Sequence, residues 1–271
     1  MSESAVADGS LDDVTDEQWE ALGSRRVFFG HQSVGENIVD GVRELLAGRP
    51  QIPLRVVTSE NPARVDGPAL IEARIGENRR PETKSEAFER ILERGFGHES
   101  GAIAMYKYCY VDVLPETDPE QLFEAYARHA ESLRRRHPGV TLAHVTIPLT
   151  TAPDGLWERA RTALGLKTAT RLNLARERFN ELLRERCGTR EPVFDLALVE
   201  SVRPDGTRAT TPCRGREVPM LAPEWTHDGG HLDEEGRLRV AEQFLIFLAD
   251  VAGRGGRSPD TTGTAAAENR I

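Results

Sequence analysis

The sequence is poor in cysteine. Three cysteines occur among 271 residues, Cys109, Cys187 and Cys213, and they are odd in number and widely spaced. Their number and spacing therefore indicate neither a disulfide framework nor a CxxC metal motif. This composition is typical of a protein kept in a reducing compartment, and we expect a cytoplasmic location.

Long apolar segments are also missing. No segment approaches the roughly 20 apolar residues that a membrane-spanning helix needs. The first 20 residues are acidic and have neither the basic start nor the apolar centre of a secretory signal. We therefore expect no membrane partner.

Positively charged residues are outnumbered by acidic ones and are dispersed along the chain. The chain has 35 lysine and arginine residues against 44 aspartate and glutamate residues, which gives a formal net charge of -9. The basic residues are distributed along the predicted helices and do not gather in one stripe. This pattern argues against a nucleic-acid partner.

The length favours one domain, because 271 residues without an internal linker can enclose one good-sized core. We expect residues 1–23 to form a partly disordered N-terminal extension and residues 24–253 to form the domain. Residues 254–271 are rich in glycine, serine, threonine and alanine and show no apolar period, so they predict a disordered tail.

Apolar segments of strand length alternate with segments of helical periodicity, which predicts an α/β protein whose parallel sheet is covered on both faces. The five predicted strands are residues 26–30, 54–58, 102–113, 141–148 and 193–199. The predicted helices are residues 34–46, 85–94, 118–136, 168–186 and 234–252. Between the last strand and the last helix, residues 201–223 form a loop long enough to be a lid or a substrate-binding segment.

Ser33 is a candidate nucleophile. It follows a strand that ends near Gly30 and precedes a helix that begins near Val34. A hydroxyl group at that turn lies near the positive end of the helix dipole, where backbone N–H groups can also stabilise an oxyanion. The alternative is that Ser33 only caps the helix, a common role of serine.

Asp228 and His231 lie three residues apart, just before the last helix, with Gly229 and Gly230 between them. The two glycines allow the loop to fold back, so that the carboxylate orients the imidazole ring. With Ser33, this pair supplies the nucleophile, base and orienting acid of a serine hydrolase. Taken alone, a histidine and an aspartate in one loop are more often a polar turn.

A metal site is a competing interpretation. His227, Asp228 and His231, together with His31, offer the nitrogen and oxygen ligands that zinc or manganese accepts. However, the sequence has no HExxH helix and no second acidic cluster to complete the coordination shell. We therefore expect neither a metal nor another cofactor.

Several further residues are candidates for oxyanion or substrate binding. Gly76 and Asn78 follow the second predicted strand, where a backbone N–H and a side-chain amide can both donate. Lys107, Tyr108 and Cys109 belong to a third segment whose polar content is unusual for a central strand, and a buried lysine must pair or lose its charge. His31 lies beside the candidate nucleophile and joins this group.

The candidate site residues occur along the chain in the order that is found in the SGNH/GDSL hydrolase superfamily. Residues 24–253 resemble that superfamily. The matching positions are Ser33 after the first strand, Gly76 in the next block, and Asp228-Gly-Gly-His231 before the last helix. The resemblance implies a flavodoxin-like three-layer α/β/α sandwich. It also implies hydrolysis or transfer of an acyl ester on a small-molecule substrate, with these three polar residues as the triad.

The chain departs from that family at two places. The first block contains Gly30-His31-Gln32-Ser33 where the family has Gly-Asp-Ser. The third block lacks the Gly-x-Asn-Asp whose asparagine donates to the oxyanion in that family. Two alternatives therefore stay open beside the acyl hydrolase or acyltransferase. One is a specialised biosynthetic enzyme that uses Lys107, Cys109 or nearby tyrosines, and the other is a non-catalytic ligand-binding descendant.

Overall fold

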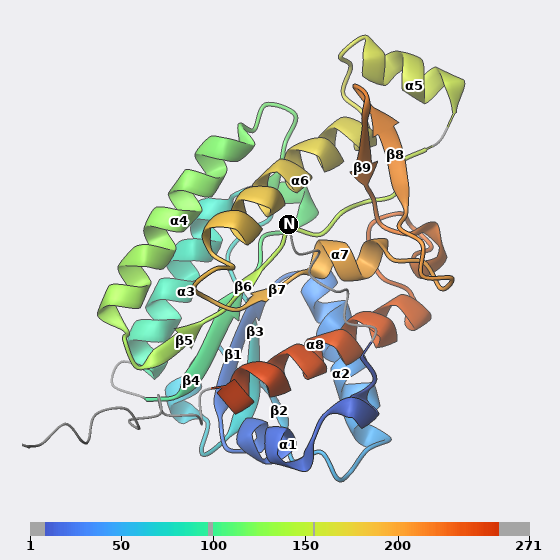
Figure 1. Ribbon diagram of the computed structural model, residues 1–271. Helices are drawn as coiled ribbons and strands as arrows, with labels where there is room; N and C mark the ends of the chain where they lie inside the picture. Colours follow the sequence, from blue (N-terminus) through green and yellow to red (C-terminus); the bar gives the residue numbers. More distant parts are fainter. Residues whose placement is uncertain (1–8, 97–99, 154, 255–271) are drawn as a thin grey trace, which may run out of the picture.

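The computed structural model describes residues 9–96, 100–153 and 155–254, and a parallel five-stranded sheet forms its centre (Figure 1). The strands lie in the order β2-β3-β1-β4-β5. Their bounds are Arg26–His31 for β1, Val56–Thr58 for β2, Ala69–Arg74 for β3, Ala102–Tyr106 for β4 and Val140–Leu142 for β5. The predicted α/β fold with a five-stranded parallel sheet is confirmed.

The sheet continues beyond β5 after a single residue. The N–H of Ala143 donates to the carbonyl oxygen of Ala104 at 2.9 Å, and β6 (His144–Val145) then pairs in parallel with β7 (Val193–Phe194). Counted this way, β3, β1, β4, β5 with β6, and β7 follow the flavodoxin-like order, and β2 is an additional edge strand.

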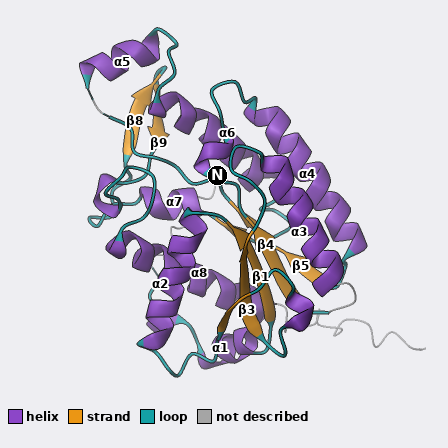
Figure 2. Ribbon diagram, turned by 180° about the vertical axis from the view of Figure 1, so that it is seen from behind, coloured by secondary structure: helices purple, strands orange, loops and turns teal. Residues whose placement is uncertain are grey.

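Helices cover both faces of the sheet and make three layers (Figures 1 and 2). One face carries α1, α2 and α8, and the other carries α3, α4 and α6. Phe29 packs on Phe244 of α8 at a ring distance of 5.0 Å, whereas its neighbour Phe28 packs on Phe88 of α3 at 6.0 Å. Successive strand residues therefore enter opposite cores, which explains the uninterrupted apolar runs of the sequence.

The five predicted helices are all present. The helix bounds are Asp16–Gly23 for α1, Val34–Ala47 for α2, Pro81–Gly95 for α3, Pro119–Arg136 for α4, Leu156–Ala163 for α5, Ala169–Arg186 for α6, Leu196–Ser201 for α7 and Glu234–Arg254 for α8. The predicted loop over residues 201–223 contains a hairpin of β8 (Thr210–Cys213) and β9 (Arg216–Pro219), which projects beside α5 at one end of the molecule (Figure 2). No described helix is long and apolar enough to cross a membrane.

Three strand predictions need correction. The sequence analysis missed β3, because its outer half carries the charged residues Glu72 and Arg74. Strand β4 ends at Tyr106, so the polar residues that follow belong to a turn beyond the sheet. The strand predicted over residues 193–199 lasts two residues, because the Asp195 side chain accepts from the N–H of Leu198 and starts α7.

Part of the predicted N-terminal extension belongs to the structured body. Helix α1 packs on α8, and its Trp19 and Leu22 are buried in the same core as α8. The remainder of that extension, residues 1–8, and residues 255–271 of the predicted tail lie outside the described residues.

Candidate active site

Ser33 occupies a strained turn at the carboxyl end of β1. Its φ of 33° and ψ of -93° lie in a region that side-chain-bearing residues rarely adopt. Such a conformation costs about 1–3 kcal/mol and is concentrated at functional sites. The side chain of Ser33 makes no capping hydrogen bond to α2. The structure therefore gives no support to the alternative that this serine is only a helix cap.

Gln32 joins this turn to the loop that follows β3. Its Nε2 donates to the carbonyl oxygens of Ile75 at 3.2 Å and Gly76 at 2.9 Å. Gly76 has a φ of 62°, and a Cβ there would lie 2.6 Å from the backbone nitrogen of Lys84, so only glycine fits. Among the described residues, the N–H groups of Ser33 and Gly76 meet no acceptor. Two candidate oxyanion donors thus lie in segments that Gln32 ties together, a role that the sequence analysis did not assign to it.

Asp228 and His231 form the hydrogen-bonded pair that the sequence predicted. The Asp228 Oδ2 lies 2.6 Å from His231 Nδ1, and its Oδ1 accepts from the N–H groups of Gly230 and His231, both at 2.8 Å. These backbone and ring donors hold the pKa of the Asp228 carboxyl well below its ordinary value. The carboxylate therefore remains ionised and fixes the ring, whose Nε2 has no partner among the described residues.

The loop of His231 lies against the first turn of α2. The N–H of Leu232 donates to Asn37 Oδ1 at 3.3 Å, and the N–H of Asn37 donates to the carbonyl oxygen of Ser33 at 3.2 Å. One residue, Asn37, therefore links the serine turn to the histidine loop, although the two are about 200 residues apart in the sequence. In the described structure, no hydrogen bond joins Ser33 Oγ to His231 itself. Such bonds often tighten only when substrate is bound.

Lys107 places a buried positive charge beneath the serine turn. The residue is fully buried, and a Cβ at Gly35 in the first turn of α2 would lie 3.0 Å from its Cε. Its Nζ lies 3.4 Å from the carbonyl oxygen of Tyr108 and 3.5 Å from Cys109 Sγ. No carboxylate of the described residues forms an ion pair with it. The polar content that was unusual for a central strand is therefore explained by the position of Lys107, which is buried beside the serine turn.

A buried ion pair supports the loop after β4. Asp112 and Lys84 are both fully buried and form a salt bridge. Asp112 also accepts from the N–H of Cys109 at 2.7 Å and from the N–H of Arg79 at 2.8 Å. Asn78, predicted as an oxyanion donor, is exposed and directs its Oδ1 to Lys84 Nζ at 3.3 Å. The ion pair therefore positions the segments on both sides of it. A carboxylate near a strand end was the single sequence feature that pointed to it.

Two other candidates point into the protein core. His31 Nε2 lies 2.9 Å from Glu72 Oε2 beneath α2, and burial lowers the pKa of the His31 ring. Burial alone would raise the pKa of Glu72, but hydrogen bonds from His31, Thr58 and Arg43 outweigh it and lower the pKa to about 2. On the opposite face of the sheet, the Tyr108 hydroxyl lies 2.9 Å from Ser85 Oγ, within the aromatic core. These contacts give both residues roles inside the fold.

The wall facing the serine turn contains Tyr110, one of the tyrosines considered for the alternative enzyme, and two residues that the sequence analysis missed, Arg176 and Thr151. The Tyr110 ring meets the His231 ring edge-on at 5.8 Å, and Arg176 lies over Tyr110 at 5.6 Å. The N–H of Thr151 donates to the carbonyl oxygen of Gly229 at 2.9 Å, which ties the histidine loop to the end of β6. Only tertiary packing joins these segments, so no local pattern identifies them.

The four ligands of the competing metal interpretation do not form one cluster, because only Asp228 and His231 lie together. His31 is committed to Glu72, and His227 is exposed and 3.9 Å from Asp233. Within the described part of the chain, one group of three side chains lies close enough together to hold a metal ion. It consists of His144, Cys187 and Glu191 and includes none of these four residues. Both nitrogens of its histidine already have partners, Tyr126 and Glu191. The arrangement around Asp228 fits proton transfer better than metal binding.

No protein-family model matches the chain, and no curated protein sequence matches it significantly. Solved structures do match. A Streptococcus pneumonia protein provisionally described as a platelet activating factor shares 13% identity, with 88% of this chain and 94% of that chain covered and a TM-score of 0.49. The OSK domain of Drosophila Oskar shares 12%, covering 87% and 97%, with a TM-score of 0.40. The periplasmic domain of a Salmonella Paratyphi A lipopolysaccharide acetyltransferase shares 9%, covering 87% and 98%, with a TM-score of 0.38. Since these values are low, the function must be inferred from the site itself.

Proposed function

We propose that this protein is a serine hydrolase or acyltransferase of the SGNH/GDSL type, acting on an acyl ester of a small molecule. The observation that carries the proposal is the strained turn of Ser33, which leaves the hydroxyl uncommitted beside a loop that contains a hydrogen-bonded Asp228–His231 pair. Strain of this kind is concentrated at functional sites, and here it presents a hydroxyl at the carboxyl edge of the sheet. A cytoplasmic location stays a prediction.

The proposed reaction has two steps. Ser33 Oγ attacks the acyl carbonyl carbon while His231 Nε2 takes its proton, and the tetrahedral intermediate then collapses as His231 returns that proton to the departing alkoxide. Water or another alcohol then attacks the acyl-enzyme by the same path and regenerates Ser33. Asp228 holds the imidazole with Nδ1 as a donor and stabilises the imidazolium that forms in each step.

Three groups are proposed to stabilise the oxyanion. The N–H groups of Ser33 and Gly76 are the direct donors, since neither has an acceptor among the described residues. The Lys107 ammonium contributes a positive field from beneath the same turn, where the low dielectric strengthens it. In this arrangement Lys107 compensates for the third-block asparagine that the chain lacks.

The test is covalent labelling with a fluorophosphonate, which reacts with a serine only when a base and an oxyanion site activate it. We expect stoichiometric labelling that peptide mapping places at Ser33. Labelling should disappear in Ser33→Ala and in His231→Ala. His227→Ala, which changes the exposed neighbouring histidine, is the matched control and should label like the wild type.

A second candidate function uses the third segment in place of the triad. It is favoured by the 3.5 Å approach of Lys107 Nζ to Cys109 Sγ, which brings two reactive side-chain types together. This alternative predicts no fluorophosphonate labelling in a folded sample and selective alkylation at Cys109. A folded protein that reacts at neither residue would favour a non-catalytic ligand-binding protein.

A further inference from the structure

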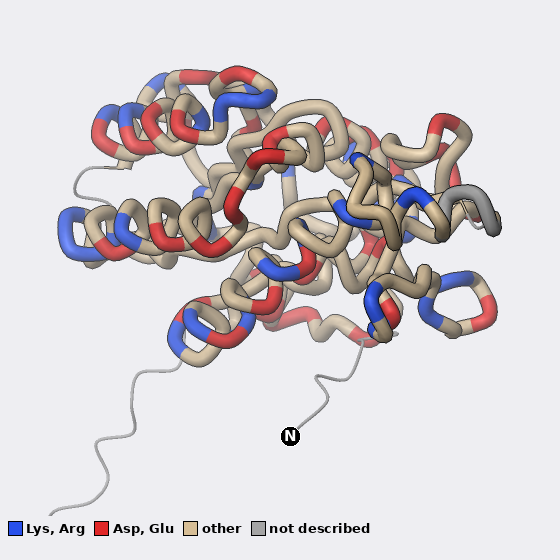
Figure 3. Tube along the Cα trace, turned by 90° about the horizontal axis from the view of Figure 1, so that it is seen from above, with Lys and Arg blue, Asp and Glu red and all other residues tan. Residues whose placement is uncertain are grey.

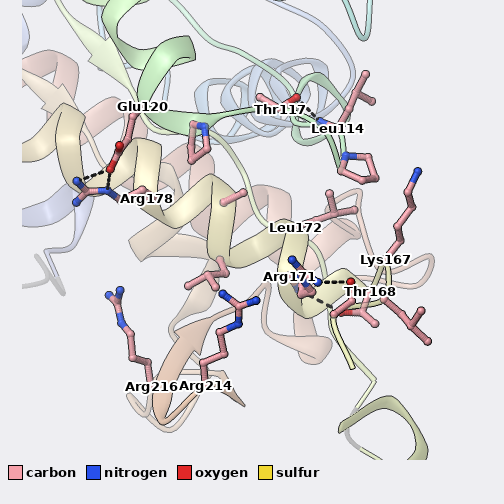
Figure 4. Close-up of a pocket in the computed structure, with 16 residues that line it drawn as sticks. Leu114, Thr117, Glu120, Lys167, Thr168, Arg171, Leu172, Arg178, Arg214 and Arg216 are labelled. Carbon is pink, nitrogen blue, oxygen red and sulfur yellow. Dashed lines mark hydrogen bonds and ion pairs between the residues drawn. The ribbon is translucent and has the colours of Figure 1, made fainter. Parts of the chain in front are cut away.

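Two adjoining cavities extend from the histidine wall along α6. One has a volume of about 490 Å³ and the other about 550 Å³, and both are lined by Leu114, Lys167 and Leu172. The cavity of about 550 Å³ ends at the β8–β9 hairpin, where Arg214 and Arg216 face the same space as Arg171 (Figure 4). We call the two cavities together the basic groove. Each is of the size that holds a small-molecule ligand.

The basic groove is unusual in its charge. Its lining contains eight basic residues and one acidic residue, Glu120. Arg178 pairs with Glu120, and Arg216 pairs with Glu181. Among the residues whose side chains the structure describes, no carboxylate forms an ion pair with four of the others: Arg79, Lys167, Arg171 and Arg214. A protein with a net charge of -9 thus exposes unneutralised positive charge at this place.

The outer surface of α4 shows the opposite arrangement. Arg134 and Arg135 both pair with Glu131, and Arg136 pairs with Glu89 and Glu93 of α3. Basic and acidic segments accordingly alternate along these outer helices (Figure 3). The arginines on α4 therefore have carboxylate partners, whereas several basic residues of the groove have none among the described residues.

The eighth basic residue, Arg176, is buried at the floor of the groove with 3% of its surface exposed. Its guanidinium donates to neutral acceptors, namely the Tyr110 carbonyl oxygen at 3.1 Å, Thr150 Oγ1 at 3.0 Å and Asn173 Oδ1 at 2.6 Å. The nearby carboxyl of Glu200 is fully buried, which raises its pKa to about 8 and keeps it largely protonated near neutral pH. A buried charge without a counter-charge is costly, and an anion in the groove would supply one.

The groove adjoins a residue that contacts the proposed catalytic base. Tyr110 lines the groove and also contacts the ring of His231. Thr150 lines it as well, and its neighbour Thr151 holds the carbonyl oxygen of Gly229 in the histidine loop. One residue, Tyr110, therefore separates a molecule in the groove from the ring of His231.

We propose that the basic groove binds an anionic portion of the substrate, bearing phosphate or carboxylate groups, while the acyl ester lies at Ser33. This inference rests on the proposed function for the position of the ester. The binding of the anion by the groove is independent of it. The substrate class is thus an ester whose acyl or alcohol part carries several negative charges, since the cations are spread over both cavities.

Binding is tested without turnover by titrating the full-length Ser33→Ala protein with tripolyphosphate and with citrate in a calorimeter. The groove variant also carries Lys167→Gln and Arg214→Gln, two exposed changes that spare the buried Arg176. The control variant instead carries Arg134→Gln and Arg135→Gln on α4. We expect the groove variant to bind tripolyphosphate at least about tenfold more weakly, as expected from lost charge-assisted contacts, and the control to bind like the parent. Absence of binding by both anions, or equal weakening in the control, would overturn the proposal.

The two anions identify the charged group. Tripolyphosphate binding much tighter than citrate indicates a phosphorylated substrate, and comparable affinities indicate that carboxylates serve as well. In wild type, saturating tripolyphosphate should slow fluorophosphonate labelling of Ser33. An unchanged labelling rate in the saturated protein would mean that the groove does not hold substrate. A failure of Ser33 to label at all would refute the proposed function while leaving anion binding to be judged on its own.

Discussion

The two walls of the crevice are held in different ways. The serine wall, made of Ser33, Gly76 and Lys107, is built on buried strands and cross-linked by Gln32 and the Asp112 ion pair. The histidine wall contains side chains that remain exposed, 41% for His231 and 56% for Asp228, and local hydrogen bonds orient them. The nucleophile is thus fixed by the fold, whereas the base is fixed by its own loop. Changes to the residues that anchor the first wall should mainly affect stability, and changes to the hydrogen-bonded pair in the second should mainly affect turnover.

The largest effect is expected in the histidine wall. In Asp228→Asn, the amide Oδ1 can still accept from the N–H groups of Gly230 and His231, so the loop should persist. The ring, however, loses the carboxylate that fixes its tautomer, and the labelling rate of Ser33 should fall about 10³–10⁴-fold. The change should leave the melting temperature nearly unaltered. Labelling at the wild-type rate would remove Asp228 from the mechanism.

The next effect belongs to the serine wall. Asp112→Asn leaves the buried ammonium of Lys84 without its counter-charge, and unfolding by urea should show a loss of about 3–5 kcal/mol. Asp250→Asn, which breaks the exposed pair with Arg254 on α8, is the control and should cost about 1 kcal/mol or less. Equal losses in the two variants would show that the serine wall is not anchored by its buried ion pair.

A smaller effect concerns the strain at Ser33. Ser33→Gly removes the side chain that disfavours a φ of 33°, and it should raise the free energy of unfolding by up to about 1–3 kcal/mol while abolishing labelling. Ser33→Ala keeps a Cβ and therefore keeps the strain. If glycine were no more stable than alanine in denaturant titrations, the turn would not store strain.

The most gradual effect is a pH slope from Glu200, which supports the histidine wall by accepting from the N–H of Leu149. Burial raises its pKa to about 8, so between pH 4.5 and 8 the folded state holds a proton that the unfolded state has released. The free energy of unfolding should therefore decrease as pH rises through this window, by at most about 1.4 kcal/mol per pH unit. Glu200→Gln should lack that slope. Parallel stability curves for the two proteins would mean that Glu200 is not held protonated.

The sequence predicted the parts of the site that depend on neighbours in the chain. Asp228 and His231 are three residues apart, so one glycine-containing loop brings them together. Ser33 stands where an apolar pattern changes and α2 begins beside it as predicted, and α8 begins at residue 234, the start of the predicted last helix. The strand over residues 193–199 was mispredicted, because its continuous apolar pattern fits a buried helix equally well.

By itself, the sequence determined the alternation of strands and helices, the turn at Ser33 and the hydrogen-bonded pair beside the last helix, because each depends on residues close together in the chain. The tertiary structure alone decided that Lys84 meets Asp112, that Tyr110 meets His231, and that dispersed basic residues converge on one groove. Such contacts join segments that are far apart in the chain. Tyr110 and His231, for example, are separated by about 120 residues. Their formation depends on strand order and layer packing, which no local pattern encodes.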